Sequence, residues 1–269
     1  MSNSTTYLYS HIGQIPQHVF DSIKSIYNVD PSSNIYVATD SVVDIPFATV
    51  YDINGIISAE TKKAFESDYE YDHGNPLWKT AMLRVFILRD LAKKLNIAEY
   101  VHFDGDVILY EPFKNIVELF DGFDGLSITP CNSHEMVYGY SYIANIDKND
   151  EICYILSKMI HTHNHLNEMQ LLSLINKDNP HLIQPLPTLP TKEHCGYIFD
   201  PSSYGQYFGG TFQDKKCGWT GDHHWIGHDI NTGVISPEMI NNKPFVKHDN
   251  ILIPIVNLHI HSKNTGDFI

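Results

Sequence analysis

The sequence has few basic residues and no place where they cluster. Its 269 residues include 18 lysines and arginines against 32 aspartates and glutamates, which gives a formal net charge of −14. A protein that binds nucleic acid neutralises the phosphate backbone with clustered lysine and arginine side chains. We therefore expect no nucleic-acid partner. The acidic surface is typical of a soluble protein.

Paired cysteines and long apolar runs are also missing. The four cysteines, Cys131, Cys153, Cys195 and Cys217, are scattered and lack the Cys-x-x-Cys spacing of a structural zinc site. We therefore expect all four to be free thiols in a protein of a reducing compartment. No apolar run reaches transmembrane length, and the N-terminus lacks a basic region followed by an apolar one. The sequence thus predicts a cytoplasmic protein with no transmembrane segment.

The beginning of the chain predicts a strand, a helix and a second strand. The length suits one large α/β domain or two small ones. Tyr7–Tyr9 and Asn34–Ala38 are the expected strands, and Ile15-Pro16 opens the helix between them. Ligands of such βαβ units usually lie beyond the carboxyl ends of the strands. Asp40 lies at such an end, either as a ligand contact or as a turn-forming aspartate.

The most informative stretch is Tyr100–Tyr110, an apolar run that Asp104-Gly105-Asp106 interrupts. Strand interiors do not tolerate two such carboxylates. At the end of a strand, however, the glycine lets the chain turn and both carboxylates converge. Two hard oxygen ligands suit Mg²⁺ or Mn²⁺ and leave positions open for phosphate oxygens. The alternative is a polar turn in a β-hairpin, which Asp-Gly also favours.

The helix before this stretch has one unusual residue. Arg84 falls within its apolar arc, where an arginine must reach solvent or find a buried anion. It could point toward Asp104 and Asp106, or brace a carboxylate in the core. The apolar face of this helix consists of Ala81, Val85, Leu88, Leu91, Ala92 and Leu95. The expected polar face consists of Arg89, Asp90, Lys93 and Lys94.

Histidines occur in two alternating groups. In an extended segment after the apolar strand Ile251–Val256, one face would carry Asn257, His259, His261 and Lys263. That face could supply a metal ligand and a cation, although polar residues of an edge strand look similar. The run from His161 to His165 also alternates, but it has no acidic partner beside it, and we favour a solvated loop. Val137–Ile143 is rich in aromatic residues and could form either a core strand or a wall on which sugars stack.

Together these residues resemble the nucleotide-sugar-dependent glycosyltransferases of the GT-A fold. The resemblance covers most of the chain: the opening βαβ unit, the helix from Leu77 to Arg84, the strand that ends in His102-Phe-Asp-Gly-Asp106, and the segment Leu258–Lys263. It implies a single domain with a Rossmann-like, mixed but mainly parallel central sheet flanked by helices. Residues 1–125 would form a nucleotide-sugar and metal-binding half, and residues 126–269 an acceptor half whose C-terminal strand returns to the metal site.

Two details bear on the family within this group. The His-x-x-Gly-x-x-Lys-Pro-Trp ending of the glycogenin-like transferases is absent, because Lys263 lies closer to the histidines and no Pro-Trp follows. The stretch Phe199–Gly210 looks like a segment of poorly characterised bacterial and viral glycosyltransferases.

The resemblance also implies roles for individual residues. Asp106 would be the principal ligand of Mn²⁺ or Mg²⁺, Asp104 would contact the metal or the ribose, and His259 or His261 would complete the coordination. The residues assigned to the nucleotide-sugar donor are His11, Asp40, Arg84, Asp104 and Lys263.

The implied activity is transfer of a hexose or deoxyhexose from a nucleoside-diphosphate sugar, with UDP favoured, to a hydroxyl of a glycan or other glycoconjugate. A cation with lysine or arginine would stabilise the charge on the leaving diphosphate. An inverting enzyme needs a carboxylate base, whereas a retaining one can use a residue beneath the sugar. The candidates for this catalytic residue are Glu168 and Asp200.

Three alternatives remain from the sequence. A sugar-phosphate nucleotidyltransferase would have a similar sheet, but its phosphate loop is rich in glycine, whereas Ser10–Gly13 contains one. A metal-dependent hydrolase with a His-x-His pair would carry that pair on its first strand. The third alternative is a non-catalytic protein that binds carbohydrate or nucleotide.

Overall fold

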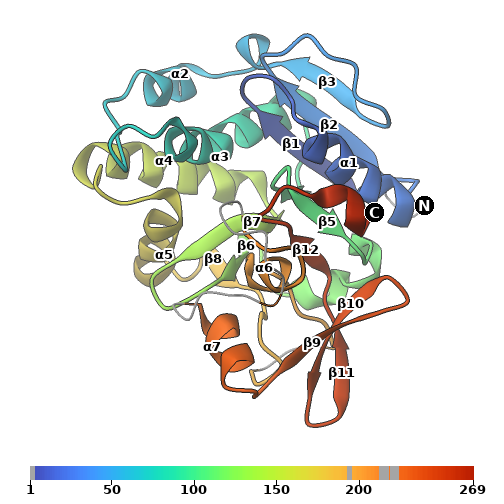
Figure 1. The fold of residues 1–269 in the computed structure, drawn as a ribbon. Helices are drawn as coiled ribbons and strands as arrows, with labels where there is room; N and C mark the ends of the chain where they lie inside the picture. The colour runs from blue at the N-terminus through green and yellow to red at the C-terminus, as the bar shows by residue number, and fades with distance from the viewer. Residues whose placement is uncertain (1–3, 193–195, 212–217, 219–223) are drawn as a thin grey trace.

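The central layer of the molecule is a seven-stranded sheet (Figure 1). The structure, a computed structural model, describes residues 4–192, 196–211, 218 and 224–269. The strands lie in the order β3 (Thr49–Asp52), β2 (Asn34–Thr39), β1 (Thr6–His11), β4 (Tyr100–Phe103), β7 (Met136–Ile143), β6 (Leu126–Pro130) and β8 (Ile183–Pro185). Strand β7 runs antiparallel to both of its neighbours, and the other adjacent pairs are parallel.

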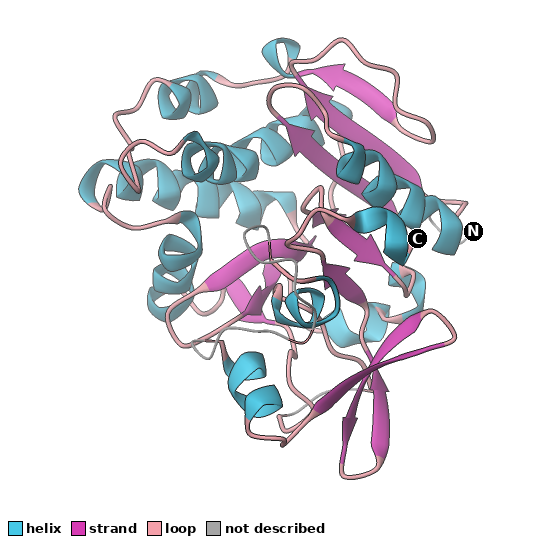
Figure 2. Cartoon of the chain, viewed as in Figure 1, coloured by secondary structure: helices cyan, strands magenta, loops and turns pink. Residues whose placement is uncertain are grey.

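Helices flank this sheet (Figure 2). Their bounds are α1 Gln17–Val29, α2 Ala59–Phe65, α3 Pro76–Leu95, α4 Ile146–Thr162, α5 Glu168–Asp178, α6 Ser203–Gly209 and α7 Trp225–Asn231. Alternate residues of β1 enter two different apolar clusters, because successive side chains of a strand point to opposite faces. Leu8 packs in the cluster that contains α3, α4 and α5, whereas Tyr7 and Tyr9 pack with α1. The mixed, mainly parallel sheet flanked by helices is thus confirmed.

Two smaller sheets contain the remaining strands. β9 (Ser236–Ile240), β10 (Lys243–His248) and β11 (Ile251–Pro254) form an antiparallel sheet beside the main body (Figure 1). β5 (Val107–Leu109) pairs antiparallel with β12 (Asn257–His259). Because β5 pairs with β12 and not with β4, the turn between β4 and β5 leads from one sheet to another. The hairpin alternative for Asp104-Gly105-Asp106 is therefore wrong.

Local sequence signals account for the two ends of helix α3. The Asn75 side chain accepts a hydrogen bond from the Leu77 N–H, and Pro76 stands in the first turn, where its missing N–H costs nothing. At the other end Asn96 adopts a left-handed conformation and closes the helix. Helix α5 begins with a capping box, in which the Asn167 side chain accepts from the Gln170 N–H and the Gln170 side chain accepts from the Asn167 N–H.

The expected polar face of α3 is wrong for two residues. Arg89 and Asp90 are 2% and 4% exposed, and Arg89 Nε lies 2.8 Å from Asp90 Oδ1. Arg89 Nη1 also lies 2.6 Å from a carboxylate oxygen of Glu60, a residue of α2. Helix α2 covers this face of α3, and residues 41–76, which include it, give only weak sequence signals. The burial of the polar face therefore depends on an element that the pattern did not reveal.

Other differences concern single segments. Strand β3 and helix α2 lie within residues 41–76, where the sequence signals are weak. Helix α7 begins in residues 222–229, a polar and aromatic stretch without a regular period from which no element is predicted; Asp222 and His223 lie outside the described residues. The apolar residues between Ile116 and Phe120 predict one short helix, but the structure has two short 3₁₀ helices in this region, Phe113–Asn115 and Val117–Phe120. Further 3₁₀ helices are Ile53–Gly55 and Thr265–Phe268. Val137–Ile143 is a buried strand rather than an open sugar-binding wall. His161 and His165 are exposed.

The predicted face of four residues after Val256 is correct only at its beginning. β12 ends at His259, and the chain then turns, with Lys263 in a left-handed conformation (φ +64°) whose N–H donates to the Ile260 carbonyl. Among the described helices, none combines the length and apolar character needed to cross a bilayer.

Candidate active site

Three different segments hold the turn Asp104-Gly105-Asp106 in place, two through backbone hydrogen bonds and one through close packing. The Asp104 N–H donates to the Gly139 carbonyl of β7 at 2.8 Å, and the Ile260 N–H donates to the Asp106 carbonyl at 2.8 Å. A Cβ on Gly105 would lie 2.6 Å from Val19 Cγ2 of α1, so only glycine allows this helix to pack so closely. The turn therefore has one fixed conformation, with Asp106 buried at 3% exposure.

His259 completes a group of three metal-ligand side chains. The register of β12 on β5 places His259 opposite Val107, the residue after Asp106. Its Nε2 lies 3.2 Å from Asp106 Oδ1 and 3.9 Å from Asp104 Oδ2. One ligand atom from each of the three residues lies within 4.8 Å of the other two. Two carboxylates and an imidazole fit a divalent cation such as Mn²⁺ or Mg²⁺.

Lys263 adds a positive charge to the same group. Its Nζ forms an ion pair with Asp106 Oδ2. Burial raises the pKa of the Asp106 carboxyl, but His259 and Lys263 more than offset this effect and hold the pKa well below its usual range. Asp106 is therefore a carboxylate at neutral pH, as a metal ligand must be.

Arg84 joins Asp104 to a buried carboxylate of another helix. Its Nη1 forms an ion pair with Asp104 Oδ1, and its Nη2 lies 3.2 Å from Oε1 of Glu168, the first residue of α5. The guanidinium also lies over the ring of Tyr138, 5.5 Å from its centroid. Both alternatives for Arg84 are thus realised, because it points toward Asp104 and also braces the carboxylate of Glu168, which is 3% exposed.

These side chains line one cavity of about 550 Å³. The size is within the range of small-molecule sites. Burial raises the pKa of Glu168, and the neighbouring Arg84 partly offsets that rise. The predicted residues that line the cavity are His11, Arg84, Asp104, Asp106, Glu168, His259, His261 and Lys263. His261 lies outside the three-residue metal-ligand group, so the geometry favours His259 as the ligand.

Two predicted site residues lie elsewhere. Asp40 is exposed and accepts a hydrogen bond from the Gly13 N–H at 2.7 Å, so it stabilises a turn and lines a separate hollow. Asp200 is fully buried, and its Oδ1 accepts N–H groups of Ser202 and Tyr204. Its Oδ2 accepts those of Gly205 and His259. Both oxygens of Asp200 are therefore occupied, and Asp200 is not among the residues that line the cavity. Of the two predicted catalytic carboxylates, Asp200 thus has a structural role instead: it holds β12 in place.

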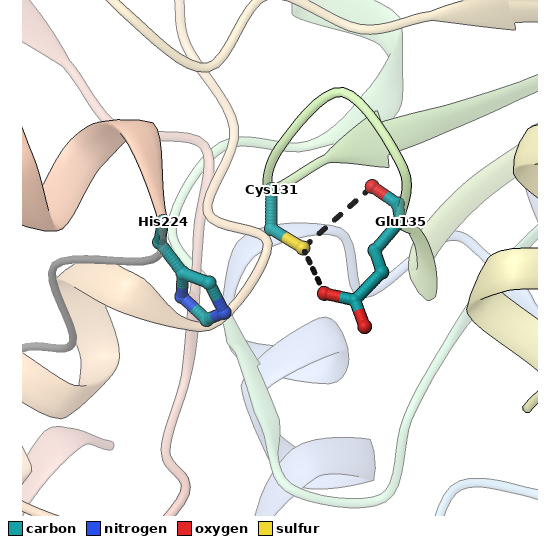
Figure 3. A group of neighbouring side chains, drawn as sticks. All are labelled: Cys131, Glu135 and His224. Atoms are coloured by element: carbon teal, nitrogen blue, oxygen red, sulfur yellow. Dashed lines mark hydrogen bonds between the residues drawn. The ribbon is translucent and has the colours of Figure 1, made fainter.

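Several residues that line the cavity were not predicted from the sequence. His18 lies near the start of α1, after the first strand, which is a common ligand position that the apolar helix pattern concealed. Gln206 lies in α6 and Thr211 lies two residues after the end of this helix, in the segment that follows Asp200. Cys131 and His224 also line the cavity, and together with Glu135 they form a second group of possible metal ligands (Figure 3).

Comparisons with known proteins give structural similarity only. No family model and no curated protein matches the sequence. Mouse xyloside xylosyltransferase 1 is similar over 69% of this chain and 86% of its own, with 11% identity and a TM-score of 0.49. The galactosyltransferase LgtC is similar over 70% of this chain and 76% of its own, with 10% identity and a TM-score of 0.46. The glycosyltransferase GlyE of Streptococcus pneumoniae is similar over 68% of this chain and 45% of its own, with 14% identity and a TM-score of 0.45.

Proposed function

We propose that this protein is a metal-dependent glycosyltransferase. It transfers a hexose or deoxyhexose from a nucleoside-diphosphate sugar, with UDP favoured, to a hydroxyl of a glycan or other glycoconjugate. The observation that carries the proposal is the convergence of Asp104, Asp106 and His259 with two cations, Arg84 and Lys263, in one cavity. Its proposed compartment is the cytoplasm, where buried thiols such as Cys153 stay reduced.

The donor set explains how the diphosphate would be held. Asp104, Asp106 and His259 would bind Mn²⁺ or Mg²⁺, and such a cation stabilises the negative charge that develops on a leaving diphosphate. Lys263 and Arg84 lie beside the same carboxylates. Their positive charges would contribute to the binding of the phosphate oxygens. Asp40, exposed and outside this cavity, has no support from the geometry as a donor contact.

Glu168 is the remaining candidate for the catalytic carboxylate. It lines the cavity, and its Oε1 lies 3.2 Å from Arg84 Nη2. This pair would hold the carboxylate in one orientation toward the cavity. The geometry is compatible with a base that deprotonates the acceptor hydroxyl or with a group beneath the transferred sugar. The acceptor would bind against the lining from the second half of the chain, which includes Pro201, Gln206 and Thr211.

The first test measures donor hydrolysis or transfer with a panel of UDP- and GDP-sugars in the presence of Mn²⁺. Asp106→Asn keeps the size of the side chain but removes its charge, so we expect activity to fall by about 100-fold or more. Asp249→Asn is the matched control. Its side chain is 86% exposed, and φ is +46°, which asparagine tolerates. Full activity of Asp106→Asn would overturn the metal assignment.

Calorimetry separates the enzyme from a non-catalytic binding protein. For the transferase we expect UDP to bind only when Mn²⁺ is present, because the carboxylates of Asp104 and Asp106 would repel the diphosphate unless a bound cation offset their charge. Glycan binding that is indifferent to metal, together with no UDP binding, would instead support a carbohydrate-binding module.

A further inference from the structure

Cys131 and His224 line the wall of the cavity and Glu135 lies beside them, although none of the three belongs to the proposed catalytic group. Cys131 follows β6, Glu135 precedes β7, and His224 precedes α7. The Cys131 N–H donates to the Glu135 carbonyl at 3.1 Å, and the Trp225 N–H donates to the Cys131 carbonyl at 3.0 Å. These backbone bonds fix the β6–β7 turn against the start of α7 and thereby bring the three side chains together.

The side chains supply one sulfur, one nitrogen and one oxygen ligand. One ligand atom from each lies within 4.8 Å of the other two. Cys131 is 2% exposed, and its Sγ lies 3.6 Å from the Glu135 carbonyl oxygen and 3.8 Å from Glu135 Oε2. Two electronegative oxygens beside the sulfur disfavour a thiolate that has no cation, so a nucleophilic role for Cys131 is not supported.

A second layer of hydrogen bonds orients two of these ligands. Ser203 Oγ lies 2.8 Å from Nδ1 of His224, and the other ring nitrogen lies on the side of the ring toward Cys131 (Figure 3). The Asn132 Nδ2 donates to Glu135 Oε2 at 2.8 Å. Histidines and carboxylates that bind metals usually have such outer partners, because these partners fix the orientation and tautomer of the ligand.

We propose that Cys131, Glu135 and His224 bind a Zn²⁺ ion. Zinc takes thiolate, imidazole and carboxylate ligands at about 2.0–2.3 Å in a tetrahedral arrangement, whereas Mn²⁺ and Mg²⁺ prefer oxygen. Three protein ligands leave a fourth position. Since Cys131 and His224 line the cavity, that position is open to water or to an oxygen of a bound molecule. No sequence motif predicts this site, because its ligands lack Cys-x-x-Cys spacing.

Zinc at this site would connect the β6–β7 turn to α7 and so stabilise one wall of the cavity. The inference goes beyond the proposed transferase activity and does not depend on it. The ligands of the proposed Mn²⁺ or Mg²⁺ site, Asp104, Asp106 and His259, contain no sulfur. A thiolate signal therefore distinguishes the two sites.

The test uses Co²⁺, which replaces Zn²⁺ and gives a near-ultraviolet charge-transfer band only when a thiolate binds it. Cys195 and Cys217 lie outside the described residues, so the full chain is prepared with Cys195→Ser and Cys217→Ser. In this background we expect a cobalt–thiolate band that one equivalent of Zn²⁺ abolishes. Cys131→Ser should remove the band, and Asp106→Asn should retain it.

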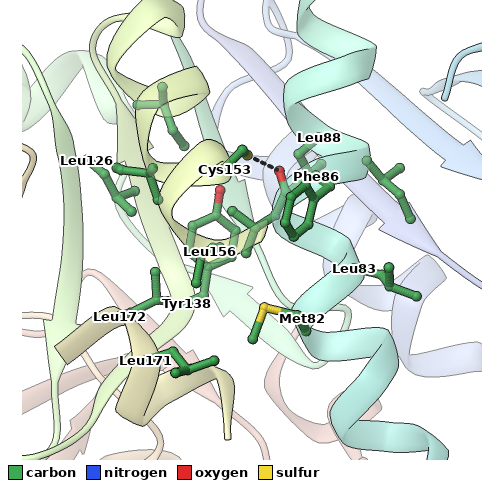
Figure 4. Close-up of a cluster of buried hydrophobic side chains, with 14 of the residues drawn as sticks. Met82, Leu83, Phe86, Leu88, Leu126, Tyr138, Cys153, Leu156, Leu171 and Leu172 are labelled. Atoms are coloured by element: carbon green, nitrogen blue, oxygen red, sulfur yellow. Dashed lines mark hydrogen bonds between the residues drawn. The ribbon is translucent and has the colours of Figure 1, made fainter. Parts of the chain in front are cut away.

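Cys153→Ser is the matched control. Cys153 is also a buried free cysteine, but its Sγ donates to the Val85 carbonyl in the apolar core (Figure 4). We expect this variant to retain the band, provided that its circular dichroism shows a folded protein. Because Cys131→Ser could itself disturb folding, Ser203→Ala supplies a second measurement. Loss of this outer partner should weaken Zn²⁺ binding, measured by competition with a chromophoric chelator, by about 10- to 100-fold.

Absence of a cobalt–thiolate band in the folded background protein would overturn the proposal. So would a band that survives Cys131→Ser, or a band that Cys153→Ser removes from a folded protein. Unchanged zinc affinity in Ser203→Ala would contradict the assigned orientation of His224 and with it the proposed ligand set.

Discussion

His259 Nε2 lies 3.2 Å from Oδ1 of Asp106, and the pairing of β12 with β5 sets this approach. Asp200 supports it from behind, because its Oδ2 accepts the His259 N–H at 2.9 Å. His261, two residues later, lies beyond the end of β12. The two histidines therefore differ in position in a way that mutation can measure.

His259→Gln should weaken Mn²⁺ binding more strongly than His261→Gln. Removing a direct ligand should cost at least the roughly 10- to 100-fold loss in affinity that removal of an outer partner produces. We expect only a small change for His261→Gln, since His261 lies outside the group of three ligands. Mn²⁺ titration followed by electron paramagnetic resonance measures both affinities, and equal losses in the two variants would contradict the assignment.

Gly139→Ala should disturb His259 without unfolding the protein. A Cβ at this position would lie 2.9 Å from His259 Nδ1 and 3.2 Å from its Cε1, so the imidazole ring must shift by a few tenths of an ångström. We expect weaker Mn²⁺ binding. Gly55→Ala is the control, because its Cβ would meet no atom within 4 Å. Calorimetric Mn²⁺ titration compares the two, and an unchanged affinity in Gly139→Ala would argue against His259 as a ligand.

Arg84→Met should destabilise the fold because it leaves Glu168 buried without its cation. Breaking a buried ion pair from one side typically costs about 3–5 kcal/mol. Since the Arg84 side chain is 16% exposed, we expect about 3 kcal/mol or less. Urea unfolding measures the change, and Glu168→Gln in the same chain should restore part of it. A double variant that is no more stable than Arg84→Met would show that the pair does not explain the loss.

Stability should fall as the solution becomes acidic because of His102. Its Nδ1 donates to the Leu8 carbonyl at 2.8 Å, and burial together with the nearby Arg84 lowers its pKa well below 6.5. The unfolded chain therefore takes up a proton near pH 6.5 that the folded chain does not. The contribution is present above pH 6.5 and is lost below it by about 1.4 kcal/mol per pH unit until the folded pKa is reached.

His102→Asn keeps a donor for the Leu8 carbonyl but cannot be protonated. Urea unfolding of the variant between pH 7.5 and pH 5 should give a shallower loss of stability than that of the original chain. The remaining slope reflects other groups, including His11 and His18, whose pKa values burial also lowers. If both proteins lost stability in parallel, His102 would not be the titrating group.

Local patterns were sufficient for the centre of the site. A strand followed by Asp-Gly-Asp fixes where the two carboxylates lie, and an arginine within an apolar arc must find an anion, as Arg84 does with Asp104. The position of His259 also follows from strand alternation. Lys263 reaches Asp106 by a different path, because a left-handed turn replaces the extended segment after β12.

Long-range contacts explain what the sequence did not predict. The sequence around Asp200 does not distinguish an aspartate that faces a cavity from one that accepts hydrogen bonds from four backbone N–H groups. The positions of β12 and α6, which donate or carry these N–H groups, determine that Asp200 is of the second kind. Arg89 is buried because α2 covers it, although nothing in α3 itself indicates a second covering helix. Cys131 and His224 meet because the backbone of α7 bonds to the end of β6.

The most direct test of the central claim is a crystal of the protein soaked with UDP and Mn²⁺. We predict an anomalous peak for manganese among Asp104, Asp106 and His259, with the diphosphate bound to the ion and near Lys263. A UDP diphosphate bound elsewhere, or a manganese peak away from these three residues, would contradict the account.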